Sequence, residues 1–277
     1  MKKYRIELTM ACLLLVCFYL LSRQAAVISV NQAETTKGEA GPLILVDAGH
    51  GGSDPGMIGM GGLEEKGINL SISLFLRDTL EKSGYSVIMT REEDKGLYDS
   101  GAANKKVQDM QRRVTMIQEH APVLSVSIHQ NSYQDSEVHG PQVFYYEGSV
   151  EGKKLAEAVQ NSLNQNLEVD RPREVKGNTS YYLLKRSSGP LVIVECGFLT
   201  NPEEAQKLQT KEYQQKVAGA VTEGIRTYLN VQYRAKRVDI VNFYEIKEVC
   251  LPYENSFAIL LLYEWKVFYT EIYRRGV

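Results

Sequence analysis

The chain has 277 residues, of which 43% are hydrophobic and 24% are charged, and its net charge is −2. This length suits one sizeable α/β domain with short appendages, and the lack of a basic excess argues against a nucleic-acid partner, because little would neutralise the phosphates. The four cysteines form no C-x-x-C pair, which argues against a disulfide framework and a thiolate zinc site.

The N-terminus joins a basic segment, Met1–Arg5, to an almost purely apolar one, Leu8–Leu21, a combination typical of an export signal. The apolar run is shorter than the roughly 20 residues of a full membrane span, but no A-x-A-like cleavage site follows it. We therefore predict that residues 1–30 form an uncleaved, apolar anchor helix; a cleaved signal peptide and a buried core helix are the alternatives. Residues 31–41 are small and polar and predict a linker.

Strand and helix patterns alternate in the body of the chain. Short apolar segments predict strands, and apolar residues spaced by three and four predict helices. In chain order these are a strand at Leu43–Asp47, a helix from Ile68 to Leu80, a strand at Tyr85–Thr90, a helix from Val107 to Ile117, a strand at Val123–Ile128, a segment at Gln142–Tyr146, a helix near Gly152–Asn166, a segment at Tyr181–Leu184, a strand at Leu191–Glu195 and a helix near Tyr213–Tyr228. The alternation predicts an α/β fold, a single layered domain whose mostly parallel or mixed central sheet is flanked by helices.

Residues 231–277 differ in composition from the rest of the chain. They are rich in Tyr and Phe and contain Trp265 and the apolar segment Phe257–Tyr263. This C-terminal extension fits an extra strand or helix packed on the domain, an appendage that contacts a partner or a membrane, or a tail without a selected role, and the sequence does not choose among the three.

His50 is the first candidate for chemistry. It lies in the sequence DAGHGG directly after the first predicted strand, and ligands of open α/β sheets bind beyond the carboxyl ends of the strands. The flanking glycines let the chain turn sharply and come close to a ligand. The alternative is an ordinary hydrogen-bonded loop histidine, and a phosphate site is not indicated, because neither G-x-G-x-x-G nor G-x-x-x-x-G-K-[ST] is present.

Two further segments place candidates at the same edge of the predicted sheet. Glu64 and Glu65 begin the first helix, where the helix dipole alone would favour acidic residues, and His129 ends a strand. If these strands are neighbours, two histidines and one carboxylate meet with one position left for water, a ligand set typical of catalytic zinc. His120, at a helix end, and His139, in a polar loop, are less suited.

Glu195 ends the strongly apolar strand that begins at Leu191. Because an uncompensated buried charge is costly, this carboxylate predicts either a salt bridge or a general base beside a metal and its water. The next residue, Cys196, has no base close to it in the sequence, so we interpret it as a small buried packing residue rather than a nucleophile.

Taken together, these motifs resemble the zinc-dependent N-acetylmuramoyl-L-alanine amidase family of the Amidase_3 type. The matching pieces, spread from about Leu43 to about Leu229, are VDAGHGGSDPG, LEEKGINL, Thr90-Arg91, SIHQNS and VECGFLTNPEE. The resemblance implies that Zn²⁺ is bound by His50, by Glu65, which directly precedes Lys66, and by His129. It implies that Glu195 is the catalytic base.

The resemblance also implies the reaction and the extent of the domain. Residues 42–230 would form a zinc amidase catalytic domain that hydrolyses the amide between N-acetylmuramic acid and L-alanine in peptidoglycan. This chain has Ala48 where the family commonly has Pro, and Ser132 where it commonly has Ala. Both flank the implied ligands without supplying a ligating atom, so they cast little doubt on the assignment.

The arrangement of one catalytic domain, an N-terminal anchor and no wall-binding repeats is similar to that of the CwlD-type amidases of endospore formers. This similarity implies action outside the cytoplasm, membrane-anchored or secreted into the cell wall or forespore intermembrane space, on the way to muramic δ-lactam in the spore cortex, with an activator lipoprotein as partner. A vegetative amidase, a zinc peptidase or deacetylase acting on the wall, and a non-catalytic wall-binding module are the alternatives. Glu195 argues against the last, since binding alone needs no general base.

Overall fold

The structure is a computed structural model that describes residues 41–250, with side chains as far as Gln232. The predicted anchor at 1–30, nearly all of the linker, and the end of the C-terminal extension lie outside the described residues. Within residues 41–250, no helix combines the length and the apolar character needed to cross a membrane.

Six strands form one mixed sheet with the order β2-β1-β3-β6-β4-β5. The strands are β1 (Leu43–Ala48), β2 (Ser86–Met89), β3 (Leu124–Asn131), β4 (Gln142–Tyr146), β5 (Lys176–Asn178) and β6 (Leu191–Phe198). Strands β2, β1, β3 and β6 pair in parallel, whereas β4 runs antiparallel to β6 and pairs in parallel with β5. The predicted α/β class with a mixed central sheet is therefore confirmed.

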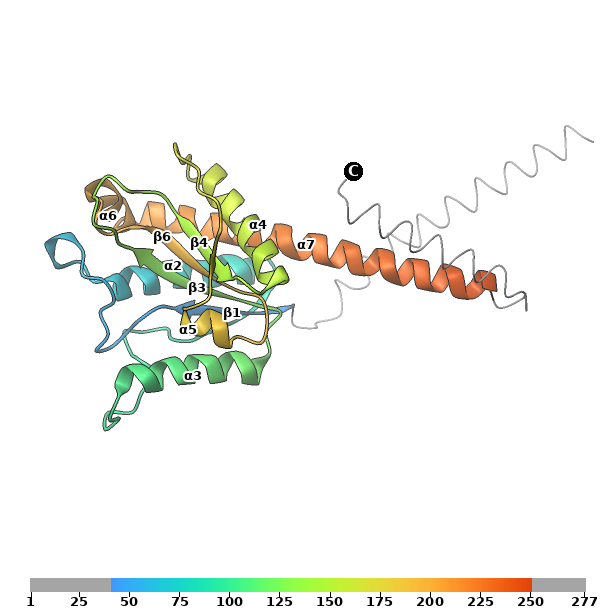
Figure 1. The fold of residues 1–277 in the computed structure, drawn as a ribbon, viewed down its shortest axis with the longest axis horizontal. Coiled ribbons are helices and arrows are strands. Elements are labelled where there is room, and N and C mark those ends of the chain that lie inside the picture. The colour runs from blue at the N-terminus through green and yellow to red at the C-terminus, as the bar shows by residue number, and fades with distance from the viewer. Residues whose placement is uncertain (1–40, 251–277) are drawn as a thin grey trace, which may run out of the picture.

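Helices cover both faces of this sheet (Figure 1). They are η1 (Met60–Gly62), α2 (Glu65–Lys82), α3 (Lys105–His120), α4 (Val150–Asn166), α5 (Tyr182–Arg186), α6 (Pro202–Leu208) and α7 (Lys211–Cys250). Helices α2, α4 and α7 pack on one face with Ile44 and Val46 of β1, while α3 and α5 pack on the other face with Leu45. The alternation of neighbouring residues in β1 between two cores follows from the period of two of a strand.

Helix α2 shows how the sequence pattern becomes packing. Ile68, Ile72, Leu76 and Leu80 recur every four residues, so they share one face of the helix, and each is at most 4% exposed. Burial of such side chains contributes about 1.5–3 kcal/mol each. The buried face fixes the helix against the sheet and thereby fixes the position of its first residue, Glu65.

Helix α7 is longer than the sequence pattern indicates. Its first half, with Val217, Val221 and Ile225 fully buried, packs against α2 and α4. The helix then continues to Cys250, past residue 230, where we placed the start of the C-terminal extension, and Figure 1 shows it extending beyond the sheet. These buried side chains explain the apolar pattern that the sequence shows near Tyr213–Tyr228.

Candidate active site

The carboxyl ends of β1, β3 and β6 lie side by side, because these strands are parallel neighbours in the sheet. His50 follows β1, and His129 lies two residues before the end of β3. Glu195 does not end its strand as expected, because β6 continues for three residues to Phe198. His129 and Glu195 occupy the same register position in neighbouring strands. Together with Glu65 at the start of α2, residues from four distant segments meet at this edge, where open α/β sheets bind their ligands.

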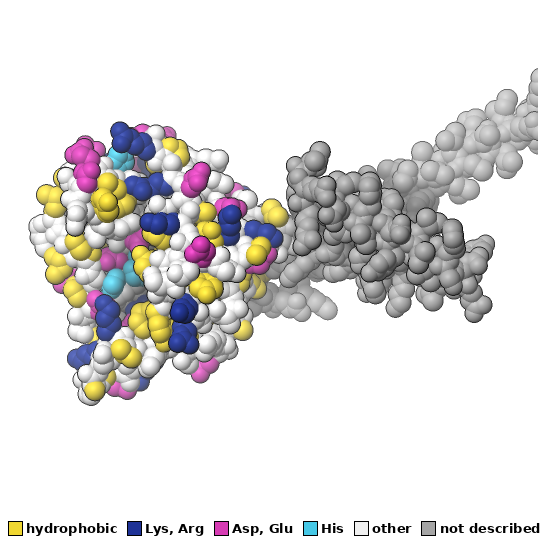
Figure 2. All heavy atoms as spheres, viewed as in Figure 1, with side chains coloured by type: hydrophobic (Ala, Val, Ile, Leu, Met, Phe, Trp, Pro, Cys, Tyr) yellow, Lys and Arg dark blue, Asp and Glu magenta, His cyan; other side chains and the backbone are white. Residues whose placement is uncertain are grey.

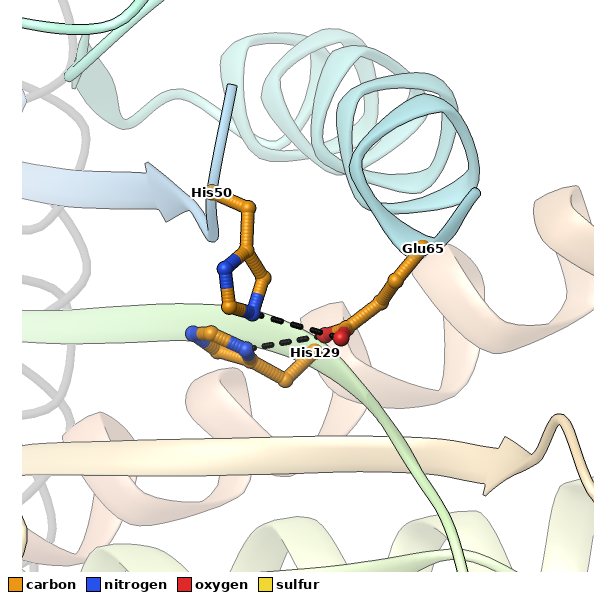
Figure 3. Close-up of side chains that lie close together, drawn as sticks. All are labelled: His50, Glu65 and His129. Atoms are coloured by element: carbon orange, nitrogen blue, oxygen red, sulfur yellow. Dashed lines mark hydrogen bonds and ion pairs between the residues drawn. The ribbon is translucent and has the colours of Figure 1, made fainter. Parts of the chain in front are cut away.

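His50, Glu65 and His129 form a compact cluster (Figure 3). The Nε2 atom of His50 lies 3.2 Å from one oxygen of Glu65, and the Nδ1 atom of His129 lies 3.0 Å from the other. One ligand atom from each residue lies within 4.8 Å of the others. Two imidazole nitrogens and a carboxylate oxygen are donors that suit zinc, so the residues present fit a metal ion of this kind.

Glu65 is only 3% exposed, and its carboxylate accepts hydrogen bonds from the backbone N–H groups of Met57, at 2.8 Å, and Gln130, at 3.0 Å. Burial alone would raise its pKa, but hydrogen bonds and charge from His129 and His50 lower the pKa far below its usual value. The side chain is therefore a carboxylate anion, the form in which it can bind a metal.

His50 adopts a backbone conformation that is uncommon for a residue with a side chain, with φ of 61°. The guanidinium of Arg113 donates to the carbonyl of His50 at 2.7 Å and holds this turn in place. The imidazole Nδ1 lies 3.0 Å from a carboxylate oxygen of Asp54, which orients the ring so that Nε2 faces Glu65. Burial would lower the pKa of His50, but the hydrogen bonds to Glu65 and Asp54 outweigh this effect and raise it.

Gly49 lies against the ring of His129. A Cβ atom at this position would come within 2.3 Å of the imidazole, closer than side chains tolerate. Gly49 thus leaves room for the ring of His129 to pack beside that of His50. The two rings meet edge to face with centroids 4.9 Å apart.

Glu195 is buried close to the cluster and differs from Glu65 in its surroundings. Its side chain is 9% exposed, and its Oε2 atom is buried without a hydrogen-bond partner among the described residues. Burial raises the pKa of Glu195 to about 7; the charge of Glu65 adds to the rise, and the two histidines oppose it. A carboxyl group with a pKa near neutrality is suited to accept and return a proton.

These side chains form the floor of an open cavity of about 300 Å³. Helix α3 supplies one wall, with Lys106 and Met110, and the segment around α5 supplies another, with Tyr181 and Tyr182. Figure 2 shows histidine and acidic side chains inside a hollow of this face, with hydrophobic and basic side chains around it. The cavity is therefore open to solvent.

A buried charged network behind His50 was not anticipated from the sequence. Arg113 is 1% exposed, forms an ion pair with Asp47, and donates to the carbonyl of Ala48 at 2.9 Å. Arg91 donates to the carbonyls of Ala48, at 2.9 Å, and Gly49, at 3.0 Å. The two arginines thus hold the backbone that leads from β1 into His50, and only Thr90-Arg91 was singled out as a motif.

The remaining sequence candidates lie elsewhere. Glu64 is exposed and pairs with Lys66 at 3.3 Å. His120 ends α3 at the surface, and His139 lies 3.0 Å from Asp170 in exposed loops. Cys196 is fully buried, and burial raises the pKa of its thiol, as expected of a packing residue.

The chain is similar in sequence to proteins of one known family. Residues 44–227 match the Amidase_3 family, described as N-acetylmuramoyl-L-alanine amidase. The chain is 38% identical over 192 residues to the germination-specific N-acetylmuramoyl-L-alanine amidase of Bacillus subtilis, covering 68% of this chain and 80% of the relative.

Two solved structures are also similar. The CwlD amidase of Clostridioides difficile, solved in complex with the GerS lipoprotein, superposes with a TM-score of 0.67 at 38% identity, covering 69% of this chain and 99% of that one. The amidase AmiC2 of Nostoc punctiforme superposes with a TM-score of 0.60 at 34% identity, covering 68% of this chain and 97% of that one. The chain therefore belongs to the Amidase_3 family of N-acetylmuramoyl-L-alanine amidases, hydrolases of peptidoglycan.

Proposed function

We propose that His50, Glu65 and His129 hold a Zn²⁺ ion and that Glu195 is the general base of amide hydrolysis. The observation that carries this proposal is the meeting of three metal-binding groups within 4.8 Å next to a buried carboxyl group that lacks a hydrogen-bond partner. When bound, zinc makes water more acidic and polarises the scissile carbonyl.

In this proposal, Glu195 transfers a proton from the attacking water to the leaving nitrogen. With a pKa of about 7, a substantial fraction of the side chain is ionised at neutral pH and takes a proton from the attacking water. The same carboxyl group then donates that proton to the departing nitrogen of L-alanine. Its unpartnered Oε2 atom is free for both steps, because no hydrogen bond within the described residues has to be broken first.

The walls of the cavity position the substrate. Tyr181 and Tyr182 are partly exposed aromatic side chains, suited to pack against the apolar faces of a sugar ring, while Lys106 on the opposite wall offers a cation to a carboxylate of the stem peptide. The scissile amide would lie between these walls and above His50, Glu65, His129 and Glu195.

Similarity to known amidases and the N-terminal sequence support a setting outside the cytoplasm. We propose that residues 42–230 form the catalytic domain and that residues 1–30 hold it at the outer face of the membrane, where peptidoglycan lies. Similarity to a germination-specific amidase and to a CwlD structure with a lipoprotein supports a role in spore cortex modification and an activating lipoprotein partner.

Muropeptide analysis tests the proposed chemistry. The full-length chain, purified in detergent, is incubated with peptidoglycan with and without a chelator, and the products are identified by mass spectrometry. We expect free stem peptides and bare glycan, loss of both on chelation, and recovery on addition of Zn²⁺. Shortened stems, lost acetyl groups, or full activity after complete metal removal would contradict the proposal.

A further inference from the structure

Asn69 lies on α2, one turn after Glu65, and is completely buried. Its Nδ2 atom donates to Oε1 of Glu65 at 3.1 Å and to the carbonyl of Gly49 at 3.2 Å. Its Oδ1 atom accepts a hydrogen bond from Nε2 of Gln130 at 3.1 Å. This one side chain therefore touches a proposed ligand and the residues next to the other two, His50 and His129.

The partners of Asn69 fix which way its amide group points. A carboxylate oxygen and a backbone carbonyl oxygen accept hydrogen bonds and cannot donate them, so the NH₂ group must face Glu65 and Gly49. The carbonyl end then faces the NH₂ group of Gln130. All three hydrogen bonds are satisfied in one orientation, and rotating the amide by 180° would place like groups against one another at each contact.

Asn69 differs from the other donors around Glu65. The N–H groups of Met57 and Gln130 also hold the carboxylate, but each is part of the backbone and joins Glu65 to a single segment. Asn69 joins the loop after β1, the start of α2 and the end of β3. These are the three segments that carry His50, Glu65 and His129.

We infer that Asn69 is a positioning residue for the metal site: its amide group ties the three ligand-bearing segments together and sets their spacing before the metal binds. The inference rests on the proposed zinc site and deepens it. Residues around the ligands of a metal that fix their orientation typically change metal affinity by 10–100-fold when altered. We therefore expect replacement of Asn69 to weaken zinc binding, separately from any change in the stability of the fold.

Zinc titration of variants of the full-length chain tests this inference. Affinity is measured by competition with a chromophoric chelator. Asn69→Asp keeps the shape of the side chain but places an acceptor against Glu65 and Gly49, so we expect zinc to bind about 10–100-fold more weakly. Asn69→Ser keeps one hydroxyl donor in a smaller side chain, and we expect it to lose less affinity than Asn69→Asp.

Gln160→Leu is the matched control. Gln160 is also a buried amide, 1% exposed, but it bonds Pro141, Val143 and Asn164, none of which lies on a ligand-bearing segment. We expect this variant to lower the melting temperature of the metal-free protein while zinc affinity stays within about twofold of wild type. A purely structural role for Asn69 would give its variants the same pattern as this control.

The outcomes separate the inference from the proposed function. If wild type and a His129→Ala variant bind zinc equally, the proposed site is wrong. If wild type binds zinc through His129 but both Asn69 variants bind it with wild-type affinity, the site stands and the positioning role is overturned. Should Asn69→Asp fail to fold, the affinity of Asn69→Ser decides: weaker zinc binding supports the inference, and unchanged binding overturns it.

Discussion

Glu195 and His129 lie side by side at one register position of neighbouring parallel strands, β6 and β3. The proposed base and a proposed metal ligand are thus held by the same ladder of backbone hydrogen bonds. Sites built on strands keep their geometry better than sites built on loops, so the spacing between the two groups is set by the sheet itself. We therefore expect that either side chain can be replaced without displacing the other.

Replacement of Glu195 by Gln is expected to lower kcat by about 10²–10⁴-fold, the usual contribution of a general base. Zinc affinity is expected to remain near that of wild type, because Glu195 forms no hydrogen bond to His50, Glu65 or His129 in the structure. Muropeptide turnover and zinc titration on the same preparation measure both quantities. Near-normal turnover by this variant would show that another group moves the proton.

The same substitution is expected to stabilise the metal-free protein at high pH. Folding raises the pKa of Glu195 from its ordinary value of 4.5 to about 7, so the folded state holds the proton more tightly than the unfolded state does. Stability from this group is present below pH 4.5 and is lost as the pH rises to 7. Each pH unit between the two pKa values corresponds to about 1.4 kcal/mol. The free energy of unfolding of Glu195→Gln relative to wild type should therefore be up to about 3 kcal/mol higher at pH 8 than at pH 4.

Urea unfolding of the chelator-treated protein at several pH values measures this gain. Wild type and Glu195→Gln are compared at pH 5, 6, 7 and 8, and the difference in the free energy of unfolding should grow with pH and level off above 7. A difference that is independent of pH would mean that Glu195 is not a buried group with a raised pKa.

Part of the sheet could be predicted from the sequence, because the central strands β1 and β6 are short apolar runs that are buried on both faces. Leu43–Asp47 and Leu191–Glu195 predict β1 and the start of β6 directly. β5, with the sequence KGN, has no apolar pattern and forms because β4 offers it an unpaired edge. The reversed direction of β4 depends on the path of the connection before it, which no local pattern reports.

The residues of the candidate site could be proposed from the sequence, but the buried ion pairs and hydrogen bonds that support them could not. His50, Glu65, His129 and Glu195 carry a signal because each follows or begins a recognisable element. Arg113 carries none: within the sequence QRRV it looks like part of the solvated face of a helix, and its partner Asp47 comes from β1. Contacts between residues so far apart emerge only when α3 packs on the sheet.

Replacement of Gly49 by Ala is expected to disturb the site locally. The added Cβ would lie 2.3 Å from the ring of His129, so the ring or the loop must move, at a cost of about 1–3 kcal/mol for overpacking together with weaker zinc binding. Gly219→Ala is the control, since a Cβ there meets nothing within 4 Å and alanine stabilises a helix interior by about 0.5–1 kcal/mol. Equal zinc affinity in both variants would contradict the tight packing of Gly49 against His129.

Arg113 and Arg112 are adjacent in α3, but replacement by Met should lower the stability far more at Arg113 than at Arg112. Arg113 is buried and pairs with Asp47 and Asp109, so Arg113→Met leaves Asp47 as an uncompensated buried charge and should cost about 3–5 kcal/mol at neutral pH. The side chain of Arg112 is 43% exposed and pairs with Asp99 at the surface, so Arg112→Met should change stability little.

The pH dependence of the stability lost in Arg113→Met identifies the cause of the loss. Burial would raise the pKa of Asp47, but the charge of Arg113 and a hydrogen bond from Ser127 lower it below its usual value of 3.8. The stability that the pair provides is therefore present above pH 3.8 and is lost as the pH falls through the lower value in the folded protein. The difference in the free energy of unfolding between wild type and Arg113→Met should accordingly shrink under acidic conditions, because protonated Asp47 no longer needs a cation. A loss of the same size at pH 3 and pH 7 would instead assign the role of Arg113 to its hydrogen bonds with the carbonyls of Ala48 and His50.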